Sequence, residues 1–429
     1  MSDDRQTLCF VDHEGLYIPL ARKLADSFDV LYYDPCEQAF PTFEAAAIGD
    51  GFEGMRKIRG IWRHKREIDF FVFPDSQGWD LQEELSDQGF PVWGSSRGER
   101  LEMDREWFHE QLGEAGLQVP KFTRIEGLSE LEEYLRDKED KYIKINRYRG
   151  SIETYHWISM EEGGYQKICS WRLKFGDIAE VVPFFVFEPI KTDLEIGGDT
   201  YNVKSEFPSH MLDGTEWKDK AYFGAFKPVE EMPEQTQAVM QAFGPILGEL
   251  GHRNFWSMEI RVKGKEFFFI DATPRAPLPG TGSQMEIYDN LADIIREGAH
   301  GNLVNPEPAA KFSVECILKQ EGNRREASSV KVPKELEQWM KLAGCCQVGD
   351  RIWFPPDEKS EGDIGWLVAI GDTPRKAIDT MKAYAEMLPD GVTARTEALV
   401  DIIKEIESAE EQGIQVTKAK MPEPAEVVE

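Results

Sequence analysis

The chain has 429 residues, enough for two to three domains of roughly 150 residues each. Its 50 lysines and arginines stand against 79 aspartates and glutamates, a formal net charge of −29. A polyanion or an anionic bilayer would meet a repelling field, so we expect no general nucleic-acid binding and no membrane partner. Hydrophobic residues make up 41% of the chain, which predicts a globular fold rather than a disordered acidic chain.

No apolar stretch approaches the roughly 20 residues that span a bilayer. The segment Met1–Thr7 is acidic and polar, which does not fit a secretory signal, so we expect a cytoplasmic protein. Six scattered cysteines lack the paired spacing of a zinc site or the density of a disulfide framework, and we expect them to be reduced. Cys9 lies in an apolar run and is expected in the core.

The first 95 residues alternate apolar runs with amphipathic segments, which predicts a small β-α-β domain with a parallel sheet. The expected elements are Thr7–Val11, Leu16–Phe28, Val30–Tyr33, Phe70–Phe73, Leu81–Leu85 and Pro91–Trp93. No G-x-G-x-x-G follows the first run and no P-loop motif is present, so a nucleotide site in this domain is not predicted. The basic run Arg56–Arg66 is interpreted either as a solvated face or as a site for an anionic group.

Helical and strand patterns continue along the rest of the chain. We expect helices at Glu99–Leu112, Leu128–Leu135, Pro233–Leu250, Pro374–Met387 and Ala394–Gln412. We expect strands at Tyr142–Ile145, between Cys169 and Val203, and at Phe255–Val262, Glu266–Ala272, Phe312–Leu318 and Ile364–Ile370. The tail Met421–Glu429, with two prolines and three glutamates, is expected to be disordered.

The predicted hairpin Phe255–Val262 and Glu266–Ala272 carries the most informative charges. With a turn of Lys263, Gly264 and Lys265, Val262 would pair with Glu266, and Glu259 and Asp271 would share one face of the sheet. Two facing carboxylates repel unless a cation lies between them, and Mg²⁺ prefers such oxygen ligands together with phosphate oxygens. The alternative is a surface hairpin whose charges are solvated.

Two further segments carry cations in informative places. Lys144 lies inside an apolar strand, and Arg147, Arg149, Gly150 and Ser151 follow it, which indicates a phosphate clamp. A lysine whose ammonium reaches solvent from the strand is the alternative. In W-K-D-K-A-Y-F-G-A-F, Lys218 precedes an aromatic, glycine-containing stretch, and an ordinary charged turn is the alternative.

The order of these segments resembles the ATP-grasp family, and most closely its phosphoribosylamine–glycine ligase branch. The similarity runs from the N-terminus to near Met387 and is carried by four features. They are the helix L-E-M-D-R-E-W-F-H-E-Q-L-G-E-A-G-L-Q-V-P, the strand lysine Lys144, the Lys-Asp-Lys segment, and D-A-T-P-R at the hairpin end, where the family has E-x-N-x-R.

The resemblance implies a site for ATP and Mg²⁺. Lys144 and Arg275 would act on the phosphates as catalytic residues, and Glu259, Asp271 and Thr273 would hold the metal. Lys144, Arg105, Lys218, Glu188 and Glu195 would bind the nucleotide, whose adenine would lie along a connecting strand at Phe184–Ile190. Phe185 and Phe187 would pack either on adenine or in the strand core.

Several positions depart from the family pattern. Thr273 replaces the family asparagine, Asp271 replaces the longer glutamate, and the two helix lysines fall on Arg105 and His109. The Gly-rich flap after Lys144 is replaced by R-Y-R-G. Nucleotide binding remains expected, whereas the branch's glycine and phosphoribosylamine substrates are not.

The expected fold is α/β with an ATP-grasp architecture. A Rossmann-like domain at 1–97 would precede an ATP-grasp region at 98–309, a small α+β domain at 310–412 and an acidic tail at 413–429. The resemblance implies an ADP-forming ligase that joins a small-molecule carboxylate to an amine through an acylphosphate, and a homodimer is compatible with it. The alternative function is a nucleotide-binding sensor or scaffold without turnover.

Overall fold

The computed structural model describes residues 5–35, 47–146, 154–191, 194–217, 220–321, 326–356 and 362–413. Its contacts divide the chain into two compact units that are both discontinuous in sequence. The first unit comprises Met1–Gly98, Ile196–Met258 and Thr273–Glu429, and the second comprises Glu99–Glu195 and Glu259–Ala272. The four-part division expected from the sequence stays a prediction.

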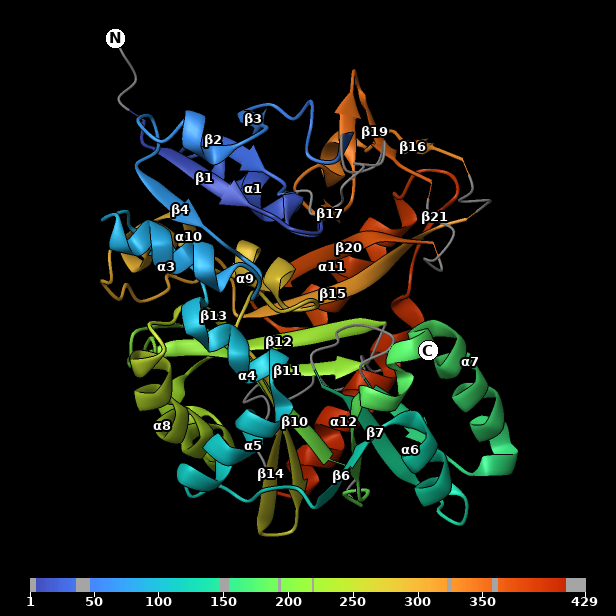
Figure 1. The fold of residues 1–429 in the computed structure, drawn as a ribbon. Coiled ribbons are helices and arrows are strands. Elements are labelled where there is room, and N and C mark those ends of the chain that lie inside the picture. Colours follow the sequence, from blue (N-terminus) through green and yellow to red (C-terminus); the bar gives the residue numbers. More distant parts are fainter. Residues whose placement is uncertain are drawn as a thin grey trace, which may run out of the picture. The chain divides into compact units, whose positions relative to one another are not determined.

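The N-terminal part of the first unit is a five-stranded parallel sheet, as the alternating pattern predicts (Figure 1). Its strand order is β3-β2-β1-β4-β5, so the chain moves outward from β1 in both directions. The strands are β1 (Thr7–Val11), β2 (Asp29–Tyr33), β3 (Met55–Ile58), β4 (Phe70–Val72) and β5 (Val92–Trp93), joined in part by the helices α1 (Ile18–Leu24) and α3 (Trp79–Asp87). Cys9 on β1 has no exposed surface, which confirms the expected core position.

A second, largely antiparallel sheet follows the order β14-β13-β10-β11-β12-β15-β20-β17, and β21 pairs with β15. Along the chain, β13 passes from the first unit into the second, and β14 returns from the second unit to the first at Thr273. The strands are β10 (Leu194–Val203), β11 (His210–Trp217), β12 (Ala221–Pro228), β13 (Arg253–Lys263), β14 (Glu266–Thr273), β15 (Phe312–Gln320), β17 (Met340–Leu342), β20 (Asp363–Gly371) and β21 (Val392–Ala394).

The described residues of the first unit also form five further α-helices and a three-stranded sheet of order β16-β19-β18. The helices are α8 (Glu234–Glu249), α9 (Thr281–Ile287), α10 (Leu291–Ala299), α11 (Pro374–Glu386) and α12 (Leu399–Glu411). The strands are β16 (Ser328–Val330), β18 (Cys346–Val348) and β19 (Arg351–Phe354). The predicted last helix begins later than Ala394 because β21 takes Val392–Ala394 into the sheet and a 3₁₀ turn follows.

The second unit is built on a four-stranded sheet of order β6-β9-β7-β8, with α6 and α7 packed on it. The strands are β6 (Phe122–Glu126), β7 (Lys141–Ile145), β8 (Thr154–Trp157) and β9 (Pro183–Phe187), and the helices are α4 (Arg100–Met103), α5 (Arg105–Glu114), α6 (Leu128–Leu135) and α7 (Tyr165–Phe175). Cys169 lies in α7, so the expected run of strands from Cys169 onward is wrong at its start.

The predicted helix Glu99–Leu112 is interrupted. It forms α4 and α5, and Asp104 between them adopts a non-helical backbone with φ −124° and ψ 88°. The Asp104 carboxylate accepts the backbone N–H of Trp107 at 3.3 Å, so this residue caps α5. Short polar side chains compete for backbone N–H groups in this way, which is why the apolar period alone did not reveal the break.

The hairpin that carries Glu259 and Asp271 also has a shorter turn than predicted. Strand β13 extends to Lys263 and β14 begins at Glu266, so the turn contains Gly264 and Lys265 alone. Gly264 has φ +62°, a left-handed conformation that a residue without a Cβ adopts at low cost. Lys263 therefore belongs to a strand, and the expected pairing of Val262 with Glu266 is not supported by these strand ends.

A buried ion pair between β11 and β12 offers a test of the first unit's core. Lys227 Nζ lies 2.6 Å from Asp213 Oδ2, and both side chains are at most 5% exposed. Lys227→Ala would leave the Asp213 carboxylate buried without this cation, so we expect a loss of about 3–5 kcal/mol in the free energy of unfolding. The double variant Asp213→Leu/Lys227→Met, which removes both charges, is expected to lose much less. Urea unfolding of the two variants measures the difference, and equal losses would contradict it.

Candidate functional site

The centre of the candidate site in the second unit is an ion pair between Lys144 and Asp271. Lys144 lies near the end of β7, and its ammonium Nζ is 3.0 Å from Asp271 Oδ2 on β14. The Lys144 side chain is 15% exposed. The strand lysine expected to reach an anion therefore does so within the protein itself, across 127 residues of chain.

Arg105, the first residue of α5, reaches the same carboxylate. Its guanidinium Nη1 lies 3.5 Å from Asp271 Oδ1, and its side chain is 4% exposed. The backbone N–H of Arg105 donates to Asn146 Oδ1 at 2.8 Å, so the start of α5 is also fastened to the residue that follows β7. Three segments distant in sequence are thereby joined at one partly exposed carboxylate.

The electrostatics of this cluster favour an anion. Burial and the neighbouring Arg105 guanidinium lower the pKa of the Lys144 ammonium below its usual value, whereas Asp271 and Glu259 act in the opposite direction. Glu259 on β13 is thus close enough to Lys144 to influence it, and both predicted metal-binding carboxylates act on the same ammonium. Two desolvated cations that share a carboxylate form a site where phosphate oxygens could replace or supplement it.

His109 lies one turn after Arg105 on α5, close enough to Arg105 and Lys144 to be influenced by their charges. Its side chain is 7% exposed and stacks on Phe122 with ring centroids 4.8 Å apart. Burial, followed by the charges of Arg105 and Lys144, lowers the pKa of the imidazole from 6.5 to about 4. The residue is therefore neutral at neutral pH, in contrast to the lysine that the resemblance would place there.

The other predicted nucleotide-binding residues do not join the ion pairs of Lys144 in the described part of the chain. Glu188 pairs with Lys141 at 3.0 Å, and Glu195 pairs with Arg261 at 3.0 Å. Their nucleotide role stays a prediction. Lys218 lies outside the described residues, as do Arg147 and Arg149.

Phe185 and Phe187 on β9 are both buried, and the ring of Phe187 lies 5.3 Å from that of His109. These contacts fit the core interpretation of the two aromatic residues. An adenine contact by either ring stays a prediction.

Arg275 is held within the first unit. Its Nε lies 3.7 Å from Asp75 Oδ1, and its Nη1 donates to Tyr17 Oη at 3.4 Å and to the Ala276 carbonyl at 3.1 Å. Thr273, the last residue of β14, precedes it by two positions. The sequence patterns singled out neither Asp75 nor Tyr17, because no periodic or motif signal links them to Arg275.

The basic run Arg56–Arg66 covers the end of β3 and a 3₁₀ turn at Ile61–Arg63. Arg56 and His64 pair with Glu67 at its border. Arg59, Arg63 and Arg66 are exposed, which suits a solvated face and equally a contact for an anionic group. Its recognition of an anion stays a prediction.

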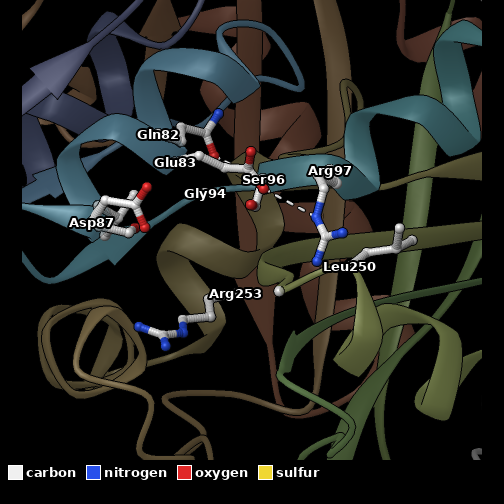
Figure 2. A pocket seen from close by; sticks show the side chains of 11 residues that line it. Gln82, Glu83, Asp87, Gly94, Ser96, Arg97, Leu250 and Arg253 are labelled. Carbon is white, nitrogen blue, oxygen red and sulfur yellow. Dashed lines mark hydrogen bonds and ion pairs between the residues drawn. The ribbon is translucent and has the colours of Figure 1, made fainter.

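A pocket of about 300 Å³ lies elsewhere in the first unit (Figure 2). Two of its charged groups pair with each other, since Arg97 lies 3.0 Å from Glu83, and Arg97 also donates to the Glu249 carbonyl at 2.7 Å. Arg253 donates to the Ala299 carbonyl at 2.7 Å. None of the predicted site residues lines this pocket. Its lining comprises Gln82, Glu83, Ser86, Asp87, Val92, Gly94, Ser96, Arg97, Leu250, Gly251 and Arg253.

The donor atoms near Lys144 fit Mg²⁺ that arrives with a nucleotide. Among the described residues there is no group of three or more His, Cys, Asp or Glu side chains arranged to hold a metal ion. Mg²⁺ commonly uses one or two carboxylates together with substrate phosphates and water rather than an all-protein cage. Glu259 and Asp271 would supply that number of carboxylates. The part that Thr273 would play, as a residue of the first unit, stays a prediction.

Comparison with solved structures identifies the fold. The chain is similar to a phosphoribosylamine–glycine ligase from Thermotoga maritima, with a TM-score of 0.67, 15% identity, and coverage of 90% of this chain and 98% of that one. It is also similar to a biotin carboxylase from Campylobacter jejuni in complex with beta-gamma-ATP, with a TM-score of 0.64, 13% identity, and coverage of 94% and 97%.

A third similar structure is the biotin carboxylase domain dimer of a 2-oxoglutarate carboxylase from Hydrogenobacter thermophilus in complex with MgADP, ADP and bicarbonate. It gives a TM-score of 0.63 at 13% identity and covers 97% of this chain and 100% of that one. The chain thus has the ATP-grasp fold, and its resemblance to the phosphoribosylamine–glycine ligase branch is confirmed for the fold. No model of a protein family and no curated protein matches the chain.

Among the described helices, none is both long enough and apolar enough to cross a membrane.

The neutral state of His109 predicts a pH dependence. A pKa lowered from 6.5 to about 4 means that the unfolded chain binds this proton more readily, so its contribution to stability is complete above pH 6.5 and is lost as the pH falls toward 4. The lost contribution corresponds to about 3 kcal/mol at most. His109→Phe removes this titration, so relative to wild type the variant should gain stability between pH 7 and pH 4.5 in urea unfolding. A constant difference between the two proteins over that range would show that His109 titrates normally in the fold.

Proposed function

We propose that this protein is an ATP-dependent, ADP-forming ligase that joins a carboxylate to an amine. The observation that carries the proposal is a pair of cations, the buried Arg105 and the largely buried Lys144, gathered around Asp271 in an ATP-grasp fold. Such a pair provides fixed positive charge where a polyphosphate would lie, and charge fixed in advance needs no reorganisation during the reaction.

The proposed reaction has two steps and balances without a redox partner. A carboxylate oxygen of the first substrate attacks the terminal phosphorus of ATP, the bond to the bridging oxygen breaks, and ADP leaves. The amine of the second substrate then attacks the carbonyl carbon of the acylphosphate. The C–O bond breaks, phosphate leaves with its electron pair, and the amine nitrogen loses a proton to give the amide. The protein has to position the reactants and balance phosphate charge, and no nucleophilic side chain is needed.

The cofactors of the proposed reaction are ATP and Mg²⁺. Lys144 and Arg105 would bind phosphate oxygens, and Arg275 would stabilise the group being transferred. Glu259 and Asp271, with the hydroxyl of Thr273, would hold the metal. Bound Mg²⁺ would neutralise part of the phosphate charge and act as a Lewis acid toward the phosphoryl group.

Asp271 has two roles in this proposal. In the protein without nucleotide it is the counter-ion of Lys144 and Arg105. When the phosphates of a bound nucleotide pair with Lys144 and Arg105, the Asp271 carboxylate would become available to the metal. The buried cations thus have an anionic partner in both states, which limits the cost of keeping charge away from water.

A sensor or scaffold that binds nucleotide without turnover is the second candidate. It is favoured by Thr273, whose neutral hydroxyl is a weaker metal ligand than a charged or amide oxygen, and by the engagement of Asp271 with two cations. A screen of carboxylate and amine pairs for ATP-dependent release of ADP and phosphate separates the two candidates. Release that requires both substrates supports the ligase, whereas ATP binding without release under any pair supports the sensor.

The metal ligands give a first mutational test. Glu259→Gln and Asp271→Asn each remove a negative charge that would balance Mg²⁺, so each is expected to lower the rate of ADP release by about 10²-fold or more. Glu266→Gln, at the exposed first residue of β14, is the matched control and should keep the wild-type rate. Wild-type rates of ADP release in both site variants would show that Glu259 and Asp271 take no part in the reaction.

Lys144 gives a test of nucleotide binding. Lys144→Met is expected to weaken ATP binding about tenfold or more in calorimetric titration, because a charge-assisted contact to phosphate is lost. The melting temperature without nucleotide should stay nearly unchanged, since Asp271 keeps Arg105 as a partner. Lys138→Met, in the same unit and paired with Asp137, is the control. A large loss of stability with ATP affinity intact would instead make Lys144 a structural ion-pair member.

A further inference from the structure

The backbone on both sides of Arg275 is hydrogen-bonded to segments that follow strands of the parallel sheet in the first unit. The backbone N–H of Ala276 donates to the Pro74 carbonyl at 2.9 Å, and Tyr17 Oη donates to the Ala276 carbonyl at 2.9 Å. The Ser95 hydroxyl donates to the Pro274 carbonyl at 2.5 Å. The residues on both sides of Arg275 are thus tied to segments that follow β1, β4 and β5 in the chain.

The Arg275 guanidinium also faces the carboxylate of Asp75, in the segment that follows β4. Asp75 follows β4 by three residues, is 2% exposed, and has its Oδ1 3.7 Å from Arg275 Nε. The same oxygen accepts the backbone N–H of Ser76 at 2.7 Å, which fixes the direction of the carboxylate. A charged carboxylate in this position is stabilised by a neighbouring cation, and Arg275 lies beside it as an ion-pair partner.

The second neighbour of the guanidinium is also fixed from the N-terminal sheet. Arg275 Nη1 donates to Tyr17 Oη at 3.4 Å. The backbone N–H of Tyr17 donates to Asp12 Oδ2 at 2.9 Å, and Tyr32 Oη donates to the same oxygen at 2.9 Å. The backbone of Tyr17 is therefore held by Asp12, the residue that directly follows β1.

We propose that Asp75 is a positioning residue that fixes the orientation of the Arg275 guanidinium for phosphoryl transfer. The N-terminal parallel sheet thereby contributes to the reaction through the loop after β4, although it carries no nucleotide-binding motif. This inference rests on the proposed function of Arg275. An arginine side chain loses much rotational freedom when it is fixed, and holding it before substrate arrives removes that cost from the reaction.

The positioning itself is tested without substrates, by NMR of the arginine Nε–H groups in the ¹⁵N-labelled full-length protein. The Arg275 signal is assigned by its disappearance in Arg275→Lys. It is expected to be protected from solvent exchange in wild type and lost to exchange in Asp75→Asn. Asp69→Asn is the matched control, because Asp69 is exposed and accepts a backbone N–H from Thr7 in the same sheet. An unchanged Arg275 signal in Asp75→Asn overturns the proposal.

The effect on the reaction is tested by chemical rescue. Added guanidinium should restore part of the ADP release lost in Arg275→Ala, because the Asp75 carboxylate can bind the free cation. The same addition should restore nothing in Arg275→Ala/Asp75→Asn. In the single variant Asp75→Asn, kcat should fall about tenfold or more while KM for ATP changes little. Equal rescue in both backgrounds, or full activity of Arg275→Ala, overturns the proposal.

The two arms separate this inference from the proposed function. If no carboxylate and amine pair supports ADP release, the ligase proposal fails, and the NMR arm still decides whether Asp75 fixes Arg275. If Asp75→Asn does not fold, Asp75→Glu replaces it, because that variant keeps the charge and moves it by one methylene. A displaced Arg275 signal and a lowered kcat are then expected, and wild-type values of both overturn the proposal.

Discussion

Two desolvated cations that share one carboxylate determine the organisation of the candidate site. Arg105 and Lys144 lie on α5 and β7, and both pair with Asp271 on β14. Neither cation could remain buried without an anion nearby, because the loss of hydration would exceed what packing returns. The carboxylate therefore fixes the relative placement of these three elements within the second unit, and the neutral His109 beside them avoids a third positive charge.

A short stretch of chain serves both compact units. Asp271 belongs to the second unit, whereas Thr273 and Arg275 belong to the first. Strand β14 is regular up to Thr273, so these residues follow one another at fixed intervals even though their side chains have different surroundings. Asp271 is surrounded by cations and Arg275 faces the carboxylate of Asp75, so each charge is balanced within its own unit.

Buried carboxylates also stabilise the segments that lead into and out of this stretch. Burial raises the pKa of Asp12 to about 7 and that of Glu315 to about 7, and each accepts backbone N–H groups. Asp12 accepts from Tyr17, and Glu315 accepts from Gly280 and Ser283 at the start of α9. Although the chain is strongly acidic, these two carboxylates serve to hold backbone rather than to keep the surface charged.

The sequence alone determined four strands of the N-terminal parallel sheet, the strand lysine and the acidic hairpin, because apolar periodicity and charge within a run are local properties of the chain. It missed β3, whose residues Met55–Ile58 overlap the basic run and form no apolar run of their own. The interruption of the helix at Asp104 and the two-residue turn at Gly264 depend on capping and backbone conformation, which the apolar period does not encode. Only the tertiary structure decided which charges meet. Glu188 and Glu195 took Lys141 and Arg261 as partners, while Asp271 took Lys144. Pairings across long stretches of chain depend on how the elements pack and on how much water each charge loses, and neither quantity can be read from residue order.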